Sequence, residues 1–131
     1  MHALILLAEK HRRPMSNKRI ADSFNISANH SSKVMQKLLK SGFVNVVRGP
    51  GGGYTLSADP ETVSLLDIYR AVDGDPDSTG CLFGSGKHCS LDTCLFSELI
   101  SDAEKLIRRH LGAVTLSDYI DMNISLVEKA D

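Results

Sequence analysis

The chain reverses direction at Arg48-Gly49-Pro50-Gly51-Gly52-Gly53-Tyr54, and this stretch decides the fold. Four glycines and one proline among seven residues cannot continue a helix. A run rich in β-branched residues, 43–47, precedes the stretch, and a second short run, 54–56, follows it. Two such runs around a glycine-rich turn predict a β-hairpin. Its tip would expose backbone N–H groups and carry Arg48 at its base, so it could lie close to a polyanion.

The glycine run has two other interpretations. A phosphate-binding loop of an NTPase requires a lysine and a helix directly after the glycines, whereas Tyr54-Thr55-Leu56 follows here. The second alternative is a hairpin turn that has no binding partner, and the glycines alone do not exclude it.

The size and composition of the chain bound the class of protein. Its 131 residues fit one domain, or one domain with an appended element, and 42% hydrophobic content is ordinary for a globular protein. No apolar run is long enough to span a membrane, and the apolar segment 1–8 lacks the basic lead-in of a signal peptide. All three cysteines lie from Cys81 to Cys94, an odd number that argues against a secreted disulfide framework. These features predict a cytoplasmic protein that does not bind membranes.

The net charge of −1 conceals an uneven distribution along the chain. Residues 10–50 hold nine Lys or Arg and one acid, a net charge of +8. Residues 51–131 hold six Lys or Arg and fourteen acids, a net charge of −8. A basic first part predicts a polyanion-binding module joined to a second element. The five histidines are scattered, and we find no arrangement of nucleophile, base and acid that predicts an enzyme.

The basic part has the pattern of a winged helix-turn-helix. Helical spacing predicts helices over 2–11, 17–24 and 28–41. Ser16 and Ser27 are plausible N-caps for the second and third helices, and Gly42 is a typical C-terminal stop. Together with the hairpin, these helices predict a mainly α protein with a small β-hairpin wing.

The third helix is predicted to expose a polar side opposite its apolar residues, which are Val34, Met35, Leu38 and Leu39. Asn and Gln can bond adenine edges, His and Ser can donate or accept, and Lys binds phosphate or guanine. A solvated polar face without a partner is the alternative, and the charge distribution and the hairpin count against it. Gln36 and Lys40 share this face. The candidate DNA-binding residues are Ser27, Asn29, His30, Ser31, Lys33, Lys37, Arg48, Gly51 and Gly52.

The acidic part is predicted to hold a loop and three helices. Helices are expected over 65–72, 95–111 and 117–126, and residues 73–94 form the cysteine loop. The apolar stripe of the long helix is wider than one small domain covers, which predicts pairing across a two-fold axis. Packing on its own winged helix alone is the alternative. We therefore expect a DNA-binding domain over 1–58 and the cysteine loop with dimerisation helices over 59–131; the first helix could also pack at the dimer interface.

The cysteine loop contains candidate metal ligands. Cys81, Cys89 and Cys94 are separated by seven and four residues. Thiolates bind soft metals and iron–sulfur clusters, and three of them leave one coordination position open. Redox-active thiols and incidental cysteines are the alternatives at this point. The nearby candidates for the fourth ligand are His88, Asp92 and Glu98.

Several segments together resemble the Rrf2 family of bacterial winged-helix transcriptional regulators. The matching segments are Ile20-Ala21-Asp22, Ile26-Ser27, Gln36-Lys37-Leu38, Gly42-Phe43-Val44, Val47 through Tyr54, Leu66 through Val72, and Thr115-Leu116-Ser117-Asp118. The resemblance implies a homodimer that acts mostly as a repressor on a palindromic operator in double-stranded DNA. The third helix would enter the major groove, and the Arg48 wing the adjacent minor groove.

The resemblance also implies a cofactor. In cluster-bearing members, three loop cysteines bind a 2Fe–2S or 4Fe–4S cluster that reports iron, redox state or nitric oxide, and these map onto Cys81, Cys89 and Cys94. Some members carry a histidine three residues after the last cysteine, where this chain has Ser97. Others take a carboxylate from a segment that precedes Met1. The fourth ligand thus stays open among water, a small thiol, the partner's His2, His88 and Asp92.

Two rival functions are retained. A cluster-free repressor would respond to thiol oxidation or to a partner protein, and it would contain no iron even after anaerobic purification. A small thiol or iron–sulfur redox protein would transfer electrons reversibly and would not bind an operator.

Overall fold

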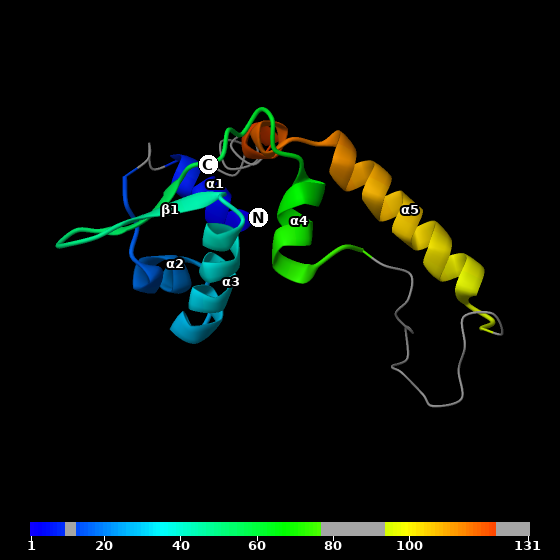
Figure 1. Cartoon of the computed structure of the whole chain (residues 1–131), viewed down its shortest axis with the longest axis horizontal. Helices are drawn as coiled ribbons and strands as arrows, with labels where there is room; N and C mark the ends of the chain where they lie inside the picture. Colours follow the sequence, from blue (N-terminus) through cyan, green and yellow to red (C-terminus); the bar gives the residue numbers. More distant parts are fainter. Residues whose placement is uncertain (10–12, 77–93, 123–131) are drawn as a thin grey trace, which may run out of the picture.

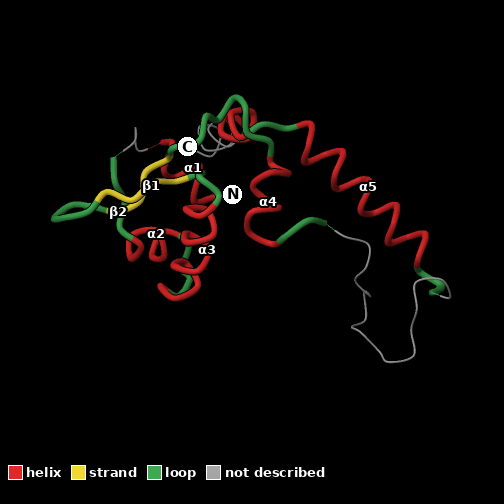
Figure 2. Tube along the Cα trace, in the orientation of Figure 1, coloured by secondary structure: helices red, strands yellow, loops and turns green. Residues whose placement is uncertain are grey.

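The structure is a computed structural model that describes residues 1–9, 13–76 and 94–122. Within these ranges it is mainly helical, with one two-stranded antiparallel sheet (Figure 1; Figure 2). The predicted fold class is therefore confirmed. In chain order the elements are α1 (His2–Glu9), α2 (Asn17–Ser23), α3 (Ala28–Lys40), β1 (Val44–Val47), β2 (Gly53–Leu56), α4 (Leu65–Asp73) and α5 (Ser97–Ala113), followed by a final helical stretch, residues 116–122. None of the helices in the described ranges combines the length and the apolar character that crossing a bilayer requires.

Helices α2 and α3 form a helix-turn-helix, and both start at the predicted serine caps. The Ser16 hydroxyl oxygen accepts a hydrogen bond from the backbone N–H of Arg19 at 3.3 Å. The Ser27 hydroxyl oxygen accepts one from the backbone N–H of His30 at 3.1 Å. These contacts satisfy N–H groups that the first helical turn leaves unpaired. Helix α2 ends one residue earlier than predicted, since the backbone turns into the left-handed region at Asn25 (φ 51°).

The hairpin follows α3 and is anchored at its far edge. Strands β1 and β2 pair antiparallel, with Val44 opposite Leu56, and residues 48–52 connect them. We call the two strands and this connection the wing. Met15 and Tyr54 exchange two backbone hydrogen bonds of 2.9 and 2.8 Å, so that the chain before α2 runs along β2. These two hydrogen bonds attach the wing to the segment that leads into the helix-turn-helix.

One apolar core joins the winged helix to α4 and to the final helical stretch. Its buried residues are Leu4, Leu7, Met15, Ile20, Met35, Leu38, Val44, Leu65, Ile68 and Leu116. Both parts of the predicted domain division contribute to this core. Leu39, one of the apolar residues of the third helix, retains 38% exposure. The inward side of α3 carries Ser31, Met35 and Leu38, and Leu39 lies about 100° further round the helix from Leu38.

Two matching caps lie side by side where α4 and the final helical stretch begin. Ser64 and Asp67 form a capping box, which confirms the predicted start of α4. Thr115 and Asp118 make the same exchange of hydrogen bonds. The backbone N–H and hydroxyl of Thr115 both donate to the Asp118 carboxylate and lower its pKa. An antiparallel bridge joins Ser64 to Thr115, so each cap helps to position the other.

Helix α5 extends away from the core and packs on α4 along one side (Figure 1). It begins and ends two residues later than predicted. Ile100 is buried on the packed side, whereas Leu99 and Leu106 are 58% and 47% exposed. Part of the predicted apolar stripe is therefore left uncovered in the single chain.

Candidate nucleic-acid interface and cysteine segment

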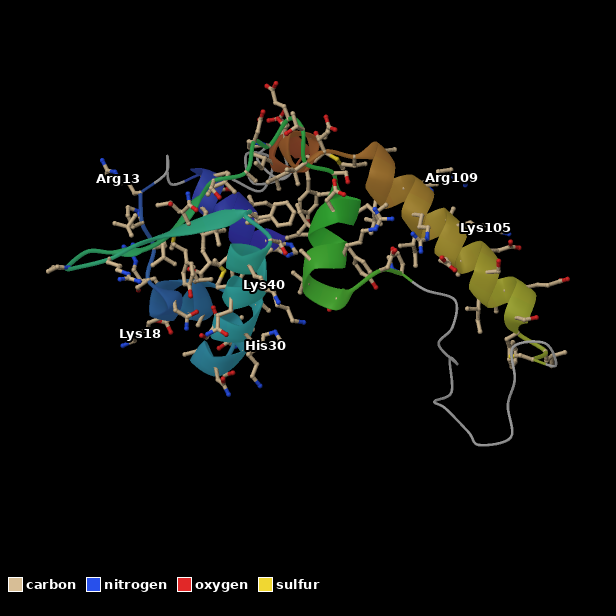
Figure 3. The ribbon with its side chains drawn as sticks, viewed as in Figure 1. Arg13, Lys18, His30, Lys40, Lys105 and Arg109 are labelled. Atoms are coloured by element: carbon tan, nitrogen blue, oxygen red, sulfur yellow. The ribbon has the colours of Figure 1, made fainter. Side chains whose placement is uncertain are left out.

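Helix α3 presents polar and basic side chains to the exterior. Asn29, His30 and Lys33 are exposed, as the sequence predicts, and α3 contains no acidic residue. Figure 3 shows His30 and Lys40 towards the two ends of α3 and Lys18 on neighbouring α2. This surface combines positive charge with neutral hydrogen-bonding groups, which is the composition that suits a nucleic acid.

Ser31 is the exception, because the sequence predicts it on the exposed side of α3 and the structure buries it. It is only 2% exposed, because it lies on the side of α3 that also carries Met35 and Leu38. Its hydroxyl finds no hydrogen-bond partner among the described residues. A side chain buried in this way does not present its hydroxyl to a groove of DNA.

Two further side chains that were predicted to contact DNA make hydrogen bonds within the protein. The Ser27 hydroxyl oxygen caps α3, although the residue itself is exposed at the helix N-terminus. The Lys37 ammonium donates a hydrogen bond to the backbone carbonyl of Val72, at the end of α4. Lys37 therefore differs from Lys33, whose exposed side chain lies one turn earlier on α3.

The wing presents Arg48 at the start of its connection, with an exposed side chain. Gly51 is also exposed and has a φ of 75°, a value that favours glycine. Gly52 has a second reason to be glycine, because a Cβ atom there would overlap the carbonyl oxygen of Val47. The N–H of Gly52 donates to the carbonyl of Gly49 at 2.9 Å. This amide is therefore used within the turn.

Of the three predicted metal-binding cysteines, Cys94 lies within the described residues, and Cys81 and Cys89 lie outside them. Cys94 is a free, half-buried thiol just before α5, and its carbonyl accepts the backbone N–H of Ser97 at 3.1 Å. Across residues 1–9, 13–76 and 94–122, no three His, Cys, Asp or Glu side chains gather closely enough to hold a metal ion.

The donor chemistry of this part of the chain fits an iron–sulfur cluster. Three cysteine sulfurs are the ligands that such clusters prefer, and Cys94 supplies a free, half-buried thiol just before α5. Glu98, one candidate for the fourth ligand, is exposed in the first turn of α5. The other two candidates, His88 and Asp92, lie outside the described residues.

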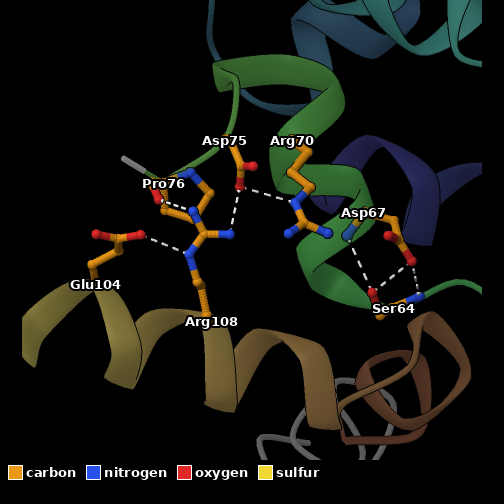
Figure 4. A network of polar contacts seen from close by, with 7 residues as sticks. All are labelled: Ser64, Asp67, Arg70, Asp75, Pro76, Glu104 and Arg108. Atoms are coloured by element: carbon orange, nitrogen blue, oxygen red, sulfur yellow. Dashed lines mark hydrogen bonds and ion pairs between the residues drawn. The ribbon is translucent and has the colours of Figure 1, made fainter. Parts of the chain in front are cut away.

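A network of ion pairs joins the end of α4 and the first residues of the cysteine loop to α5 (Figure 4). Oδ1 of Asp75 accepts hydrogen bonds from Nε of Arg70 at 3.0 Å and from Nη1 of Arg108 at 2.9 Å. Arg108 also donates to the carbonyl of Pro76 at 2.6 Å and to Oε1 of Glu104 at 2.8 Å. The hydrogen bond from Arg70 and the charge of Arg108 lower the pKa of Asp75. The hydrogen bond to Glu104 raises the pKa of Arg108.

This network was not predicted from the sequence. The spacing of Glu104 and Arg108, four residues apart on one helix, was a signal that could have suggested their pairing. The contact of Arg108 with Asp75 spans 33 positions and depends on how α5 packs against α4.

Comparisons with known proteins agree with this geometry. A family model, Rrf2, described as an iron-dependent transcriptional regulator, matches residues 1–122. The transcriptional regulator NsrR of Bacillus licheniformis is 34% identical, over 98% of this chain and 91% of that protein. The regulator IscR of Vibrio vulnificus is 36% identical, over 86% of this chain and 66% of that protein.

A solved structure has the same fold. The oxidised form of Staphylococcus aureus CymR matches with a TM-score of 0.67 and 26% identity, over 89% of this chain and 86% of that one. The family match covers the helix-turn-helix, the wing, α4 and α5 together. The chain therefore belongs to the Rrf2 family of transcriptional regulators.

Proposed function

We propose that this protein is a homodimeric repressor that binds a palindromic operator in double-stranded DNA. Helix α3 enters the major groove, and the wing lies in the adjacent minor groove. The observation that carries the proposal is the exposed, acid-free polar face of α3 next to an exposed wing with Arg48. Membership of a family of transcriptional regulators supports DNA as the polyanion.

The first half of α3 supplies the contacts in the major groove. In helix-turn-helix proteins, the N-terminal residues of the second helix reach base edges. Asn29 and His30 are exposed in this position and can donate to or accept from bases, and Lys33 binds phosphate or guanine. Ser27, at the N-cap, lies where the helix terminus attracts a phosphate group.

The wing supplies the contact in the minor groove. A narrow minor groove has a strong negative potential that attracts an arginine side chain, here Arg48. Gly51 leaves the tip without a side chain, so the backbone can approach closely. Gly52 likewise adds no side chain to the connection, and its amide is bonded within the turn.

Helix α5 is the proposed dimer interface. Leu99, Leu106 and Ile107 are exposed large apolar side chains on one helix. Pairing of two such helices across a two-fold axis buries both stripes, because the same surface serves both subunits. A two-fold dimer places its two recognition helices symmetrically, which corresponds to a palindromic operator.

Cys81, Cys89 and Cys94 are the proposed ligands of an iron–sulfur cluster, through which the repressor senses iron, redox state or nitric oxide. When bound, the cluster supplies one-electron redox chemistry. The chain contributes three sulfurs, of which the Cys94 sulfur lies just before α5. Glu98, in the first turn of α5, is a candidate for the fourth ligand.

One experiment tests DNA binding and the cofactor together. The protein is purified without oxygen, its iron and sulfide are measured, and its affinity is titrated against a duplex that it selects from a randomised library. We expect iron and sulfide in the wild type and their loss in Cys94→Ser. Arg48→Ala should weaken binding and reduce the salt slope of log K by about 0.9 per lost phosphate contact.

The matched control is Lys105→Gln, which removes a cation from exposed α5 and should leave the salt slope unchanged. An Arg48→Ala variant with the affinity and salt slope of the wild type would contradict the role of the wing.

A second candidate function is a cluster-free repressor controlled by thiol oxidation or by a partner protein. It is favoured by the structural match to CymR, which was crystallised in an oxidised form. This candidate predicts no iron after anaerobic purification, together with operator binding that changes when the thiols are oxidised. Iron analysis therefore separates the two candidates while operator binding remains common to both.

A further inference from the structure

Lys37 lies on the recognition helix, but its ammonium is bonded to another part of the chain. Helix α4 lies between α3 and α5 (Figure 1), and it packs on both of them. The Lys37 Nζ atom donates a hydrogen bond to the carbonyl oxygen of Val72, in the last turn of α4. This contact spans 35 positions of sequence and connects α3 directly to the C-terminal end of α4.

The sequence of α4 explains why this carbonyl accepts a lysine. In a continuing helix, the carbonyl of Val72 would bond to the N–H of the residue four positions later. That residue is Pro76, which has no N–H. The carbonyls of a last helical turn also form the negative end of the helix dipole, where a cation is favourable. Lys37 therefore supplies both the missing donor and a matching charge.

The residues that directly follow this turn are bonded to α5. Asp75 accepts from Arg70 of α4 and from Arg108 of α5, and Arg108 also bonds to the carbonyl of Pro76. Residues 72–76 are thus held by α3 on one side and by α5 on the other. This short segment therefore contributes, together with the apolar core that joins α3 to α4, to the orientation of α3 relative to α5.

We infer that Lys37 is a positioning residue of the recognition helix and does not bind a DNA phosphate. The inference rests on the proposed function, in which α3 reads the operator and α5 forms the dimer. Because α5 of each subunit would lie at the two-fold axis, the Lys37–Val72 contact sets the spacing and tilt of the two recognition helices. Lys33, one turn earlier on α3, instead binds a DNA phosphate through its exposed ammonium.

The salt dependence of operator binding separates these two roles. Each lost phosphate contact reduces the slope of log K against log salt concentration by about 0.9, or about 1.8 for the two subunits of a dimer. We expect this reduction for Lys33→Gln. Lys37→Gln should lower the affinity on the order of tenfold, a typical size for coupling between sites, while its slope stays that of the wild type. Lys37→Arg keeps a cationic donor and should restore most of the affinity.

A double-mutant cycle tests the connection to α5 with the full-length protein and the same selected duplex. If Lys37 acts through residues 72–76, Lys37→Gln and Arg108→Gln disturb the same segment. Their losses of operator affinity are then not independent. The combined loss should then fall short of the product of the single losses by at least about twofold. Lys33→Gln with Arg108→Gln is the matched control and should give simple multiplication of the two losses. Circular dichroism of every variant verifies that it is folded; Lys37 is exposed, so its replacement is compatible with folding.

The outcomes distinguish this inference from the proposed function. A slope for Lys37→Gln that falls as much as that for Lys33→Gln would show that Lys37 binds phosphate, and would overturn the inference alone. Unchanged slope and affinity in Lys37→Gln would also overturn it, because the contact would then position nothing. If neither Lys33→Gln nor Arg48→Ala alters binding, the proposed role of α3 and the wing fails instead.

Discussion

Arg108 and Asp75 stand 33 positions apart in the sequence, yet Nη1 of Arg108 lies 2.9 Å from Oδ1 of Asp75. The same oxygen accepts a hydrogen bond from Nε of Arg70 at 3.0 Å. One carboxylate thus connects the end of α4 to α5. Because two cations surround it, its pKa lies below the ordinary value of 3.8.

Asp75→Asn should destabilise the protein in a manner that depends on pH. A carboxyl whose pKa is lower in the folded state contributes stability above its unfolded pKa of about 3.8, and loses it as the pH falls through the folded value. The denaturation midpoint of Asp75→Asn should lie below that of the wild type at pH 7, and the two should converge under acid conditions. Urea titrations from pH 7 down to acid conditions measure the difference between the two denaturation midpoints.

The control for this titration is Asp102→Asn, which removes the carboxylate of an exposed pair with Lys105 on α5 alone. Such pairs contribute little, so its midpoint should differ less from that of the wild type. A difference between Asp75→Asn and the wild type that stays constant down to low pH would show that the ionised carboxylate is not the source of the stability.

Gly53→Ala should destabilise the wing more than Gly49→Ala. Both glycines have positive φ values, 151° and 101°. A Cβ atom on Gly49 meets nothing within 4 Å, so that variant should lose about 1–2 kcal/mol from backbone strain. A Cβ atom on Gly53 overlaps the backbone of Met15, and the loss should exceed about 3 kcal/mol. Chemical denaturation of the two variants gives the comparison, and equal stabilities would show that the approach of Met15 does not require glycine.

The fold could be predicted largely because its boundaries are marked by local chemistry. Ser16, Ser27 and Ser64 cap helices through contacts within three residues, so the sequence alone contains the signal. The start of α5 was placed two residues early because apolar spacing continues through Leu95 and Phe96, where the backbone is not yet helical. Periodicity records which side chains share a face, but not where the hydrogen bonds begin.

The candidate site was less predictable because exposure depends on packing between distant elements. Lys33 and Lys37 look equivalent on α3, and only the position of α4 separates them. The contact of Asp75 with Arg108 likewise requires α5 to return along α4. These relationships follow from tertiary structure, and helical spacing does not encode them.

Ser31→Ala should leave operator affinity unchanged and should raise stability slightly. The hydroxyl of Ser31 is buried and has no partner among the described residues, so removing it relieves an unsatisfied polar group, a gain of up to about 1 kcal/mol. Ser27→Ala is the matched control on the same helix and should lose about 1 kcal/mol with its cap. Thermal unfolding and operator titration measure both effects. Weaker operator binding by Ser31→Ala at unchanged stability would show that its hydroxyl reaches the DNA after all.

Leu106→Glu should separate the proposed dimer into folded monomers. Leu106 is 47% exposed in the single chain, so a carboxylate there is tolerated by the subunit itself. At a two-fold interface the substitution acts twice, and losing two buried leucines weakens association by about 3 kcal/mol or more, on the order of 100-fold. Analytical ultracentrifugation over a range of concentrations measures the dissociation constant. Lys105→Glu introduces the same carboxylate at an adjacent polar position and should remain dimeric. If Leu106→Glu assembles like the wild type, the exposed stripe of α5 is not the dimer interface, and α5 does not set the spacing of the recognition helices.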